Sequence, residues 1–166
     1  MKKLLFTLLL LCLLMGSKAF AQFEKTVGVG AHVKYGVEIE SMGAGIHLHY
    51  YHTNNLRFAP AFTYYVPQKG NTVWEAEADA HYIVPVSVSA SLYPIIGLNY
   101  SNRNFDASKA GFPEEKDWTK RRLGANIGVG AQHDIRYRLR ANFELKYQYV
   151  KDFSQISFMA GVGFWF

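Results

Sequence analysis

Histidine side chains are the first candidates for chemistry in this sequence, because imidazole nitrogens bind transition metals. His32 lies in one segment of alternating polarity, and His47 and His49 lie in the next, two residues apart. This spacing would place all three on one face of adjacent β-strands, where they could hold a metal ion. No carboxylate in those two segments joins them, so we interpret the histidines as hydrogen-bonding groups of a polar interior. The sequence therefore predicts no metal site and no cofactor.

Acidic residues also recur at every second position, at Glu75, Glu77 and Asp79. Such a row could form a carboxylate site, but three like charges on one strand face call for cationic partners, because buried charges must be paired. We expect a closed network of ion pairs that fills the interior. Its other predicted members are Arg57, Arg138, Arg140, Glu144 and Lys146.

The residues that position these groups alternate between apolar and polar with a period of two, which indicates β-strands rather than helices. Each alternating segment has about the 9 to 11 residues that a tilted transmembrane strand needs. The glycine-rich stretches share this alternation and lack phosphate-loop spacing. Eight such segments cover residues 26–35, 42–51, 56–66, 74–84, 88–100, 122–133, 138–149 and 155–166.

One face of these segments is apolar and carries no charge, whereas the other collects the charged residues and the glycines. A soluble barrel would place its apolar side chains inward. An outer-membrane barrel has the opposite arrangement, with an apolar band against lipid and a polar lumen. Glycines on the charged face would make room for long side chains in a narrow interior. The predicted fold is therefore an all-β, eight-stranded antiparallel up-and-down transmembrane β-barrel.

The connection between the fifth and sixth segments, residues 101–121, is the longest and is predicted to be an extracellular loop. Phe105, Phe112 and Trp118 lie among its charged residues, and exposed aromatic side chains can anchor a binding surface. We interpret Pro60 and Pro94 as sites of bulges or register shifts, since a closed barrel has no edge strand to accommodate a missing N–H.

The N-terminus resembles a secretory signal peptide, with Lys2 and Lys3 before an apolar run and Ala19-Phe20-Ala21 as a cleavage site. We expect residues 1–21 to be removed and residues 22–166 to form one barrel domain. Removing Lys2, Lys3 and Lys18 from the 18 basic residues leaves 15 against 13 acidic ones, a net charge of +2 rather than +5. No nucleic-acid partner is therefore expected.

From Gln22 to Phe166 the pattern resembles the small eight-stranded outer-membrane β-barrel family, the OmpA-barrel and OmpX-like group also described as the outer membrane protein beta-barrel domain. The terminal VGFWF, with Val162, Phe164 and Phe166 on one face, is similar to the family's C-terminal assembly signal. The resemblance implies secretion, insertion by the barrel-assembly machinery, and a multi-pass location in the outer membrane of a Gram-negative bacterium. Its surroundings would be membrane lipid and lipopolysaccharide, and any surface protein partner is unknown.

Enzymes built on such barrels resemble one another in using histidine with serine or aspartate near the outer leaflet. The predicted extracellular loops contain no histidine. We therefore expect a non-enzymatic protein that serves envelope structure or surface interaction through its loops. Two alternatives stay open at this point: a narrow, porin-like pore for ions or small solutes, and an outer-leaflet lipid-modifying enzyme.

Overall fold

The computed structural model describes residues 25–111 and 116–166. The predicted signal peptide and the contact candidate Phe112 lie outside this range. One short helix, α2 (Ala107–Ala110), accompanies the strands. In chain order the strands are β1 (Val27–Gly36), β2 (Ser41–Tyr51), β3 (Leu56–Tyr65), β4 (Asn71–Tyr82), β5 (Val84–Pro85), β6 (Ala90–Phe105), β7 (Trp118–Arg136), β8 (Leu139–Val150) and β9 (Gln155–Trp165).

The strands form one closed antiparallel barrel. Each pairs with its neighbour along the chain, and β1 pairs with β9 to close the circle. β5 is a two-residue continuation of β4 that pairs with the same strand, β6, so eight strands form the wall. The predicted all-β, eight-stranded antiparallel barrel is confirmed. Within the described part of the chain, no helix is long and apolar enough to cross a membrane.

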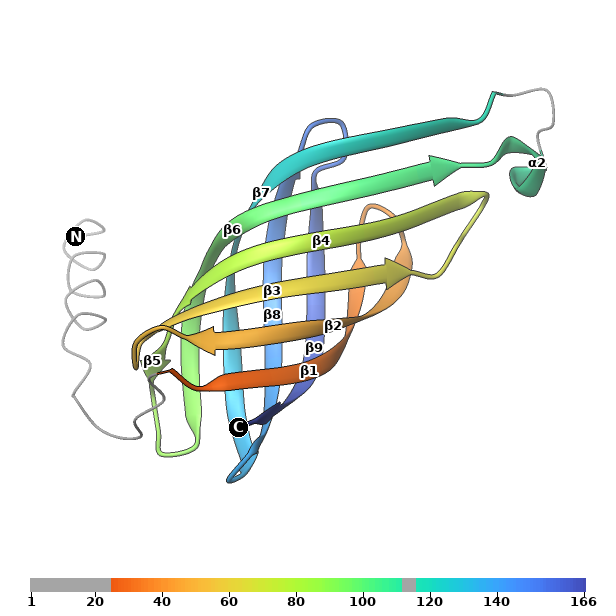
Figure 1. Cartoon of the computed structure of the whole chain (residues 1–166). Coiled ribbons are helices and arrows are strands. Elements are labelled where there is room, and N and C mark those ends of the chain that lie inside the picture. The colour runs from red at the N-terminus through yellow and green to blue at the C-terminus, as the bar shows by residue number, and fades with distance from the viewer. Residues whose placement is uncertain (1–24, 112–115) are drawn as a thin grey trace, which may run out of the picture.

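The barrel has two different ends (Figure 1). We call the end with the C-terminus and the β7–β8 turn the turn end. β4, β6 and β7 extend toward α2 at the opposite end, which we call the hairpin end. β6 and β7 stay paired out to Phe105 and Trp118. Residues 101–105 and 118–121, predicted to belong to a loop, are therefore strands.

Apolar side chains cover the outside of the barrel and charged side chains fill the inside. In β1, Val33 is 49% exposed whereas the adjacent Lys34 is fully buried, and in β8 Leu145 is 43% exposed whereas Lys146 is 1% exposed. Successive side chains of a strand point to opposite faces, so the period of two in the sequence becomes a lipid-compatible exterior and a polar lumen.

Glycines on the inner face make space for the large inward side chains. A Cβ atom added at Gly28 would lie 2.7 Å from the Trp165 ring, and one at Gly45 would lie 2.6 Å from His32 Nε2. Both distances are too short for a real side chain. The glycines therefore allow the neighbouring rings to occupy a lumen that is only just wide enough for them.

Pro60 and Pro94 lie at gaps in the strand pairing but do not shift the register. The β2–β3 pairing stops at His47–Ala61 and resumes at Tyr50–Phe58 in the same register, which spans Pro60. Pro94 lies between the β4–β6 and β5–β6 pairings, which also share one register. The expected bulges at Pro60 and Pro94 are thus wrong. The register shift instead falls between Asp134 and Arg136, near the β7–β8 turn.

Candidate functional site: the lumen and the outer hairpin

An acidic row on β4 meets two lysines in the middle of the lumen. Lys34 Nζ lies 2.9 Å from a Glu75 oxygen and 3.0 Å from a Glu77 oxygen. Lys146 Nζ lies 3.1 Å from Glu77 and 2.9 Å from Asp79. These five side chains are buried, and Glu77 joins the two lysines. The result is a chain of alternating charges across the interior.

Neutral amide side chains satisfy the remaining carboxylate oxygens of this row. Gln148 Nε2 donates to Glu77 over 2.8 Å, and Gln155 Nε2 donates to Glu75 over 2.9 Å. Asn126 Nδ2 donates to both Glu77 and Asp79, at 2.9 and 2.8 Å. Such hydrogen bonds offset the cost of taking carboxylates out of water.

A second cluster surrounds Arg57, nearer the turn end. Arg57 donates to Gln132 Oε1 over 2.7 Å and to His81 Nδ1 at 2.7 Å, and its guanidinium lies 4.6 Å from the Tyr93 ring centroid. We expected Arg57 to pair with the acidic residues of β4. It contacts aromatic and amide groups instead, because its position on β3 lies opposite His81.

Glu144 links the two clusters. Its carboxylate accepts from the Tyr93 hydroxyl over 3.1 Å and lies 3.4 Å from Lys146 Nζ. Arg140, four residues before Glu144 on the same face of β8 and nearer the turn end, donates to the Tyr51 hydroxyl over 2.8 Å and pairs with Asp134. Its guanidinium also lies 4.6 Å from the Trp165 ring.

Arg138 is not part of this interior. It was expected to line the lumen because it shares the even numbering of Arg140. β8 begins only at Leu139, so Arg138 falls in the β7–β8 turn, where it is exposed beside Tyr137. Strand alternation applies only within the strand, and the turn directs this side chain to solvent.

The buried charges of the described residues balance. The buried cations are Lys34, Arg57, Arg140 and Lys146, and the buried anions are Glu75, Glu77, Asp79 and Glu144. Four charges of each sign therefore face one another in the lumen. Such an interior needs no counterion to be neutral.

Four histidines also lie in the lumen, in a row. His32 Nδ1 is 3.3 Å from His47 Nδ1, the His47 and His49 rings are 4.6 Å apart, and the His49 and His81 rings are 6.1 Å apart. Ligand atoms of His49, His81 and Glu144 come within 4.8 Å of one another. Sequence spacing did not suggest this trio, because its members come from three separate strands.

The trio does not fit a metal ion well. A metal-bound histidine usually donates its second ring N–H to a carboxylate or carbonyl. Here Arg57 donates to His81 Nδ1, so a neutral His81 ring carries its proton on Nε2, the nitrogen that faces away from Arg57. A cationic guanidinium in that position opposes the binding of a second cation. We interpret the row as part of the polar packing of the lumen.

The paired ends of β6 and β7, which we call the outer hairpin, bring together two of the predicted contact residues. Phe105 and Trp118 face each other across β6 and β7, and their rings stack with centroids 5.6 Å apart at an angle of 18°. Asp106 caps α2 by accepting from the Lys109 N–H over 3.2 Å. Hydrogen bonds from the Ser108 hydroxyl and from Lys109 lower the pKa of Asp106 to about 2.

Val162 and Phe164 lie on the outer face of β9, and Phe166 directly follows the strand. Val162, Phe164 and Phe166 are exposed, and the rings of Phe164 and Phe166 meet edge to face with centroids 5.3 Å apart. This is the face on which the sequence predicts an assembly signal.

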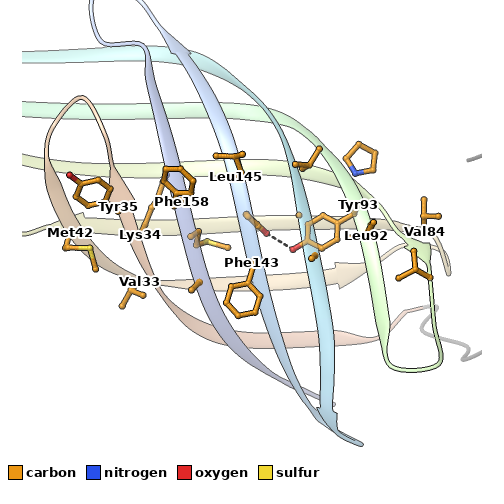
Figure 2. A pocket seen from close by; sticks show the side chains of 18 residues that line it. Val33, Lys34, Tyr35, Met42, Val84, Leu92, Tyr93, Phe143, Leu145 and Phe158 are labelled. Carbon is orange, nitrogen blue, oxygen red and sulfur yellow. Dashed lines mark hydrogen bonds between the residues drawn. The ribbon is translucent and has the colours of Figure 1, made fainter. Parts of the chain in front are cut away.

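A hollow of about 860 Å³ crosses the outer surface from β1 over β9, β8 and β7 to β6, with single residues of β2 and β5 at its margins. Figure 2 shows that exposed apolar side chains such as Val33, Phe143 and Phe158 line it. The Tyr93 hydroxyl instead donates to the buried Glu144 carboxylate. Its wall is continuous with the apolar exterior. We therefore assign it to the lipid-compatible surface rather than to a small-molecule site.

This architecture, an apolar exterior around a polar lumen in a closed eight-stranded wall, is that of the small outer-membrane β-barrels. No protein-family model matches the chain. No curated protein matches it either. Solved structures do match, and the identities below 25% establish the shared fold alone.

The N-terminal β-barrel domain of Pseudomonas aeruginosa OprF superposes with a TM-score of 0.74 at 21% identity, covering 88% of this chain and all of that one. Neisserial surface protein A gives a TM-score of 0.65 at 18% identity, covering 84% and 95%. Ail, the attachment invasion locus protein of Yersinia pestis, gives 0.62 at 16% identity, covering 86% and 99%.

Proposed function

We propose that this chain is a non-enzymatic integral protein of the outer membrane of a Gram-negative bacterium, with a lumen closed by its own charges. The hairpin end faces the cell exterior, and its loops make the contacts that define the protein's role in envelope structure or surface interaction. Short connections such as the β7–β8 turn then lie in the periplasm, as is typical of these barrels.

The observation that carries this proposal is the balanced set of four cations and four anions that the described part of the chain buries in the lumen. Removing one partner of a buried ion pair strands a charge in a poorly solvated interior, which is strongly unfavourable. An open water path would require several of these pairs to separate together. The interior therefore acts as a plug, and function falls to the outer surface.

The surface role agrees with the names of two structural neighbours, an attachment invasion locus protein and a surface protein. In this chain, the exposed hairpin end would contact lipopolysaccharide and molecules outside the cell. The aromatic residues at the C-terminus, Phe164 and Phe166, would be read by the barrel-assembly machinery after secretion. Neither contact requires a catalytic group.

The positions of the histidines argue against the lipid-modifying alternative. His32, His47, His49 and His81 are buried in the lumen. His52 lies in the β2–β3 turn at the turn end, and the exposed His133 lies on β7 near the β7–β8 turn, at the same end. A general base must reach the group from which it takes a proton. No histidine in the described connections of the hairpin end could act on a lipid of the outer leaflet.

A narrow pore is the second candidate, and unsatisfied polar groups favour it. The side-chain amides of Asn99 and Asn142 are buried, and none of their nitrogen or oxygen atoms has a hydrogen-bond partner among the described residues. Buried groups of this kind are usually satisfied by internal water. A continuous file of such waters would conduct small ions.

Expression of the full chain in a bacterium that lacks its own major porins tests the proposal. We expect the uptake rate of a small hydrophilic β-lactam to stay at the level of the empty vector, and the lipid A mass spectrum to remain unchanged. Faster uptake would support the pore, and a new or missing acyl chain on lipid A would support the enzyme. Either result would contradict a closed, non-enzymatic barrel.

A further inference from the structure

Two like charges face each other at the outer hairpin. Arg103 on β6 and Lys120 on β7 are directly paired, an arrangement that destabilises a sheet unless something offsets the repulsion. Nearby cations have acidic partners, Arg122 with Asp152 and Lys109 with Asp106. Among the described residues no ion pair engages Arg103 or Lys120, and the buried Nε of Arg103 has no hydrogen-bond partner.

Aromatic rings hold the two cations in place. The Arg103 guanidinium lies 4.2 Å from the Phe153 ring centroid, and Lys120 Nζ lies 5.5 Å from the same centroid. Lys120 Nζ is also 4.9 Å from the Trp118 ring, which stacks on Phe105. Glu38 and Glu75 attract the Arg103 guanidinium without forming an ion pair with it, and the cation–π contacts do not neutralise either cation. Rigid aromatic and arginine groups are frequent anchors of binding surfaces.

A polar cleft of about 210 Å³ adjoins Arg103 at the mouth of the barrel. Its other charged lining residues are Glu38, Glu40 and Lys69, and Tyr65, Gln68 and Asn71 add neutral polar groups. Hydrogen-bond donors and acceptors therefore surround a small space, with the two carboxylates placed to accept from hydroxyls. It is smaller than the roughly 300–1,000 Å³ of pockets for drug-sized ligands. A single sugar ring, whose hydroxyls could donate to carboxylates and amides, suits it better than a larger molecule.

The strand face on which Arg103 and Lys120 lie determines which ligands can reach them. Arg103 and Lys120 continue the inner face of their strands, whereas Arg121 lies on the outer face. Lipopolysaccharide packed around the barrel would meet the outer face first. A ligand for the inner face arrives from the aqueous side, over the mouth.

We propose that Arg103 and Lys120 bind the sulfate or phosphate group of a soluble saccharide outside the cell, with one sugar ring in the adjoining cleft. This inference rests on the proposed surface function and gives it a ligand class and a place. An anion between the two cations would remove their mutual repulsion and gain charge-assisted hydrogen bonds. Phe153 and Trp118 keep both cations in position for it.

Calorimetric titration of the refolded chain in phosphatidylcholine nanodiscs tests the site, with sucrose octasulfate as the anionic probe and sucrose as the uncharged one. We expect the octasulfate to bind and sucrose to give no heat. The R103Q/K120Q variant should weaken octasulfate binding by about tenfold or more. The control R121Q/R136Q removes the same charge from an outer-face and a turn-end position and should change Kd by less than about twofold.

A heat-shifted gel band must first show that every variant is folded. Equal losses in both double variants, or no binding to the unmodified chain, would overturn the site but leave the closed barrel intact, because permeability is measured separately. Repeating the titration in nanodiscs that contain lipopolysaccharide should preserve octasulfate binding. Its loss there would assign the pair to the membrane's own lipid and overturn the soluble ligand.

Discussion

Lys146 is the residue on which the interior depends most, because a single ammonium group contacts Glu77, Asp79 and Glu144. We predict that Lys146→Met lowers the free energy of unfolding by about 3–5 kcal/mol, since it leaves buried carboxylates without this partner. Urea titration in lipid vesicles, followed by tryptophan fluorescence, measures the change.

An exposed lysine provides the control for this prediction. Lys69 pairs with Glu40 at the surface, and its side chain is 81% exposed, so Lys69→Met should cost no more than about 1 kcal/mol. If the two variants were equally stable, the lumen pairs would contribute little, and the plug would lose its energetic basis.

Gly45 shows how tightly the lumen is packed. A side chain there would meet the Phe62 carbonyl and the His32 ring, so Gly45→Leu should cost about 1–3 kcal/mol or prevent folding. Ala44→Leu, one position away on the exposed face, should leave stability nearly unchanged. The refolding yields of the two variants can be compared as the fraction of heat-shifted protein on a gel. Equal yields would mean that the two faces have been assigned wrongly.

The sequence could predict which face a charged residue occupies, but not its partner. Alternation assigned Arg57 and Lys146 to the interior, where both are buried. It could not show that Arg57 would meet His81 and Gln132 instead of carboxylates, because partners across the lumen depend on strand stagger. It also misplaced Arg138, since numbering does not indicate where a strand begins.

At the scale of elements, the strands within the apolar band were predictable and their extensions were not. Alternation defined eight strands because lipid on one side and a polar lumen on the other impose opposite residue types. Beyond the band polar residues occur on both faces of β6 and β7, so residues 101–105 and 118–121 lack the alternation of apolar and polar types. The aromatic pair Phe105 and Trp118 was the only signal there, and it suggested contact rather than pairing.

The tip of the hairpin should respond to acid through Asp106. Its pKa is lowered to about 2 by the hydrogen bonds from Ser108 and Lys109, below the usual value near 4 for aspartate. A lowered pKa means that the carboxylate stabilises the folded turn above pH 4, and that this contribution disappears as the pH falls through about 2. The chemical shift of the Lys109 amide should follow that transition.

Asp106→Asn is the matched control for the acid response. Asparagine also caps helices through its side-chain oxygen, so the capped turn should persist in this variant while the transition near pH 2 disappears from the Lys109 amide. An identical titration in both proteins would mean that another group controls the tip.

At the scale of the whole molecule, the barrel combines an exterior suited to lipid with an interior that neutralises itself. The four buried cations and four buried anions come from β1, β3, β4 and β8, so strands from different parts of the barrel wall are tied together across the lumen. This arrangement should make the lumen the most stable part of the protein and leave the hairpin end free to vary in its contacts. A function confined to the outer surface therefore requires that the lumen be closed.

Planar-bilayer conductance of the refolded chain from Gln22 to Phe166 tests this most directly, after a heat-shifted gel band has confirmed folding. We predict no current steps for the unmodified chain. The double variant E77A/K146A should open small, steady steps, because it removes two side chains from the centre of the network while preserving net charge. Steady steps from the unmodified chain, altered when Glu77 alone is neutralised, would show that the lumen conducts and would contradict a closed barrel.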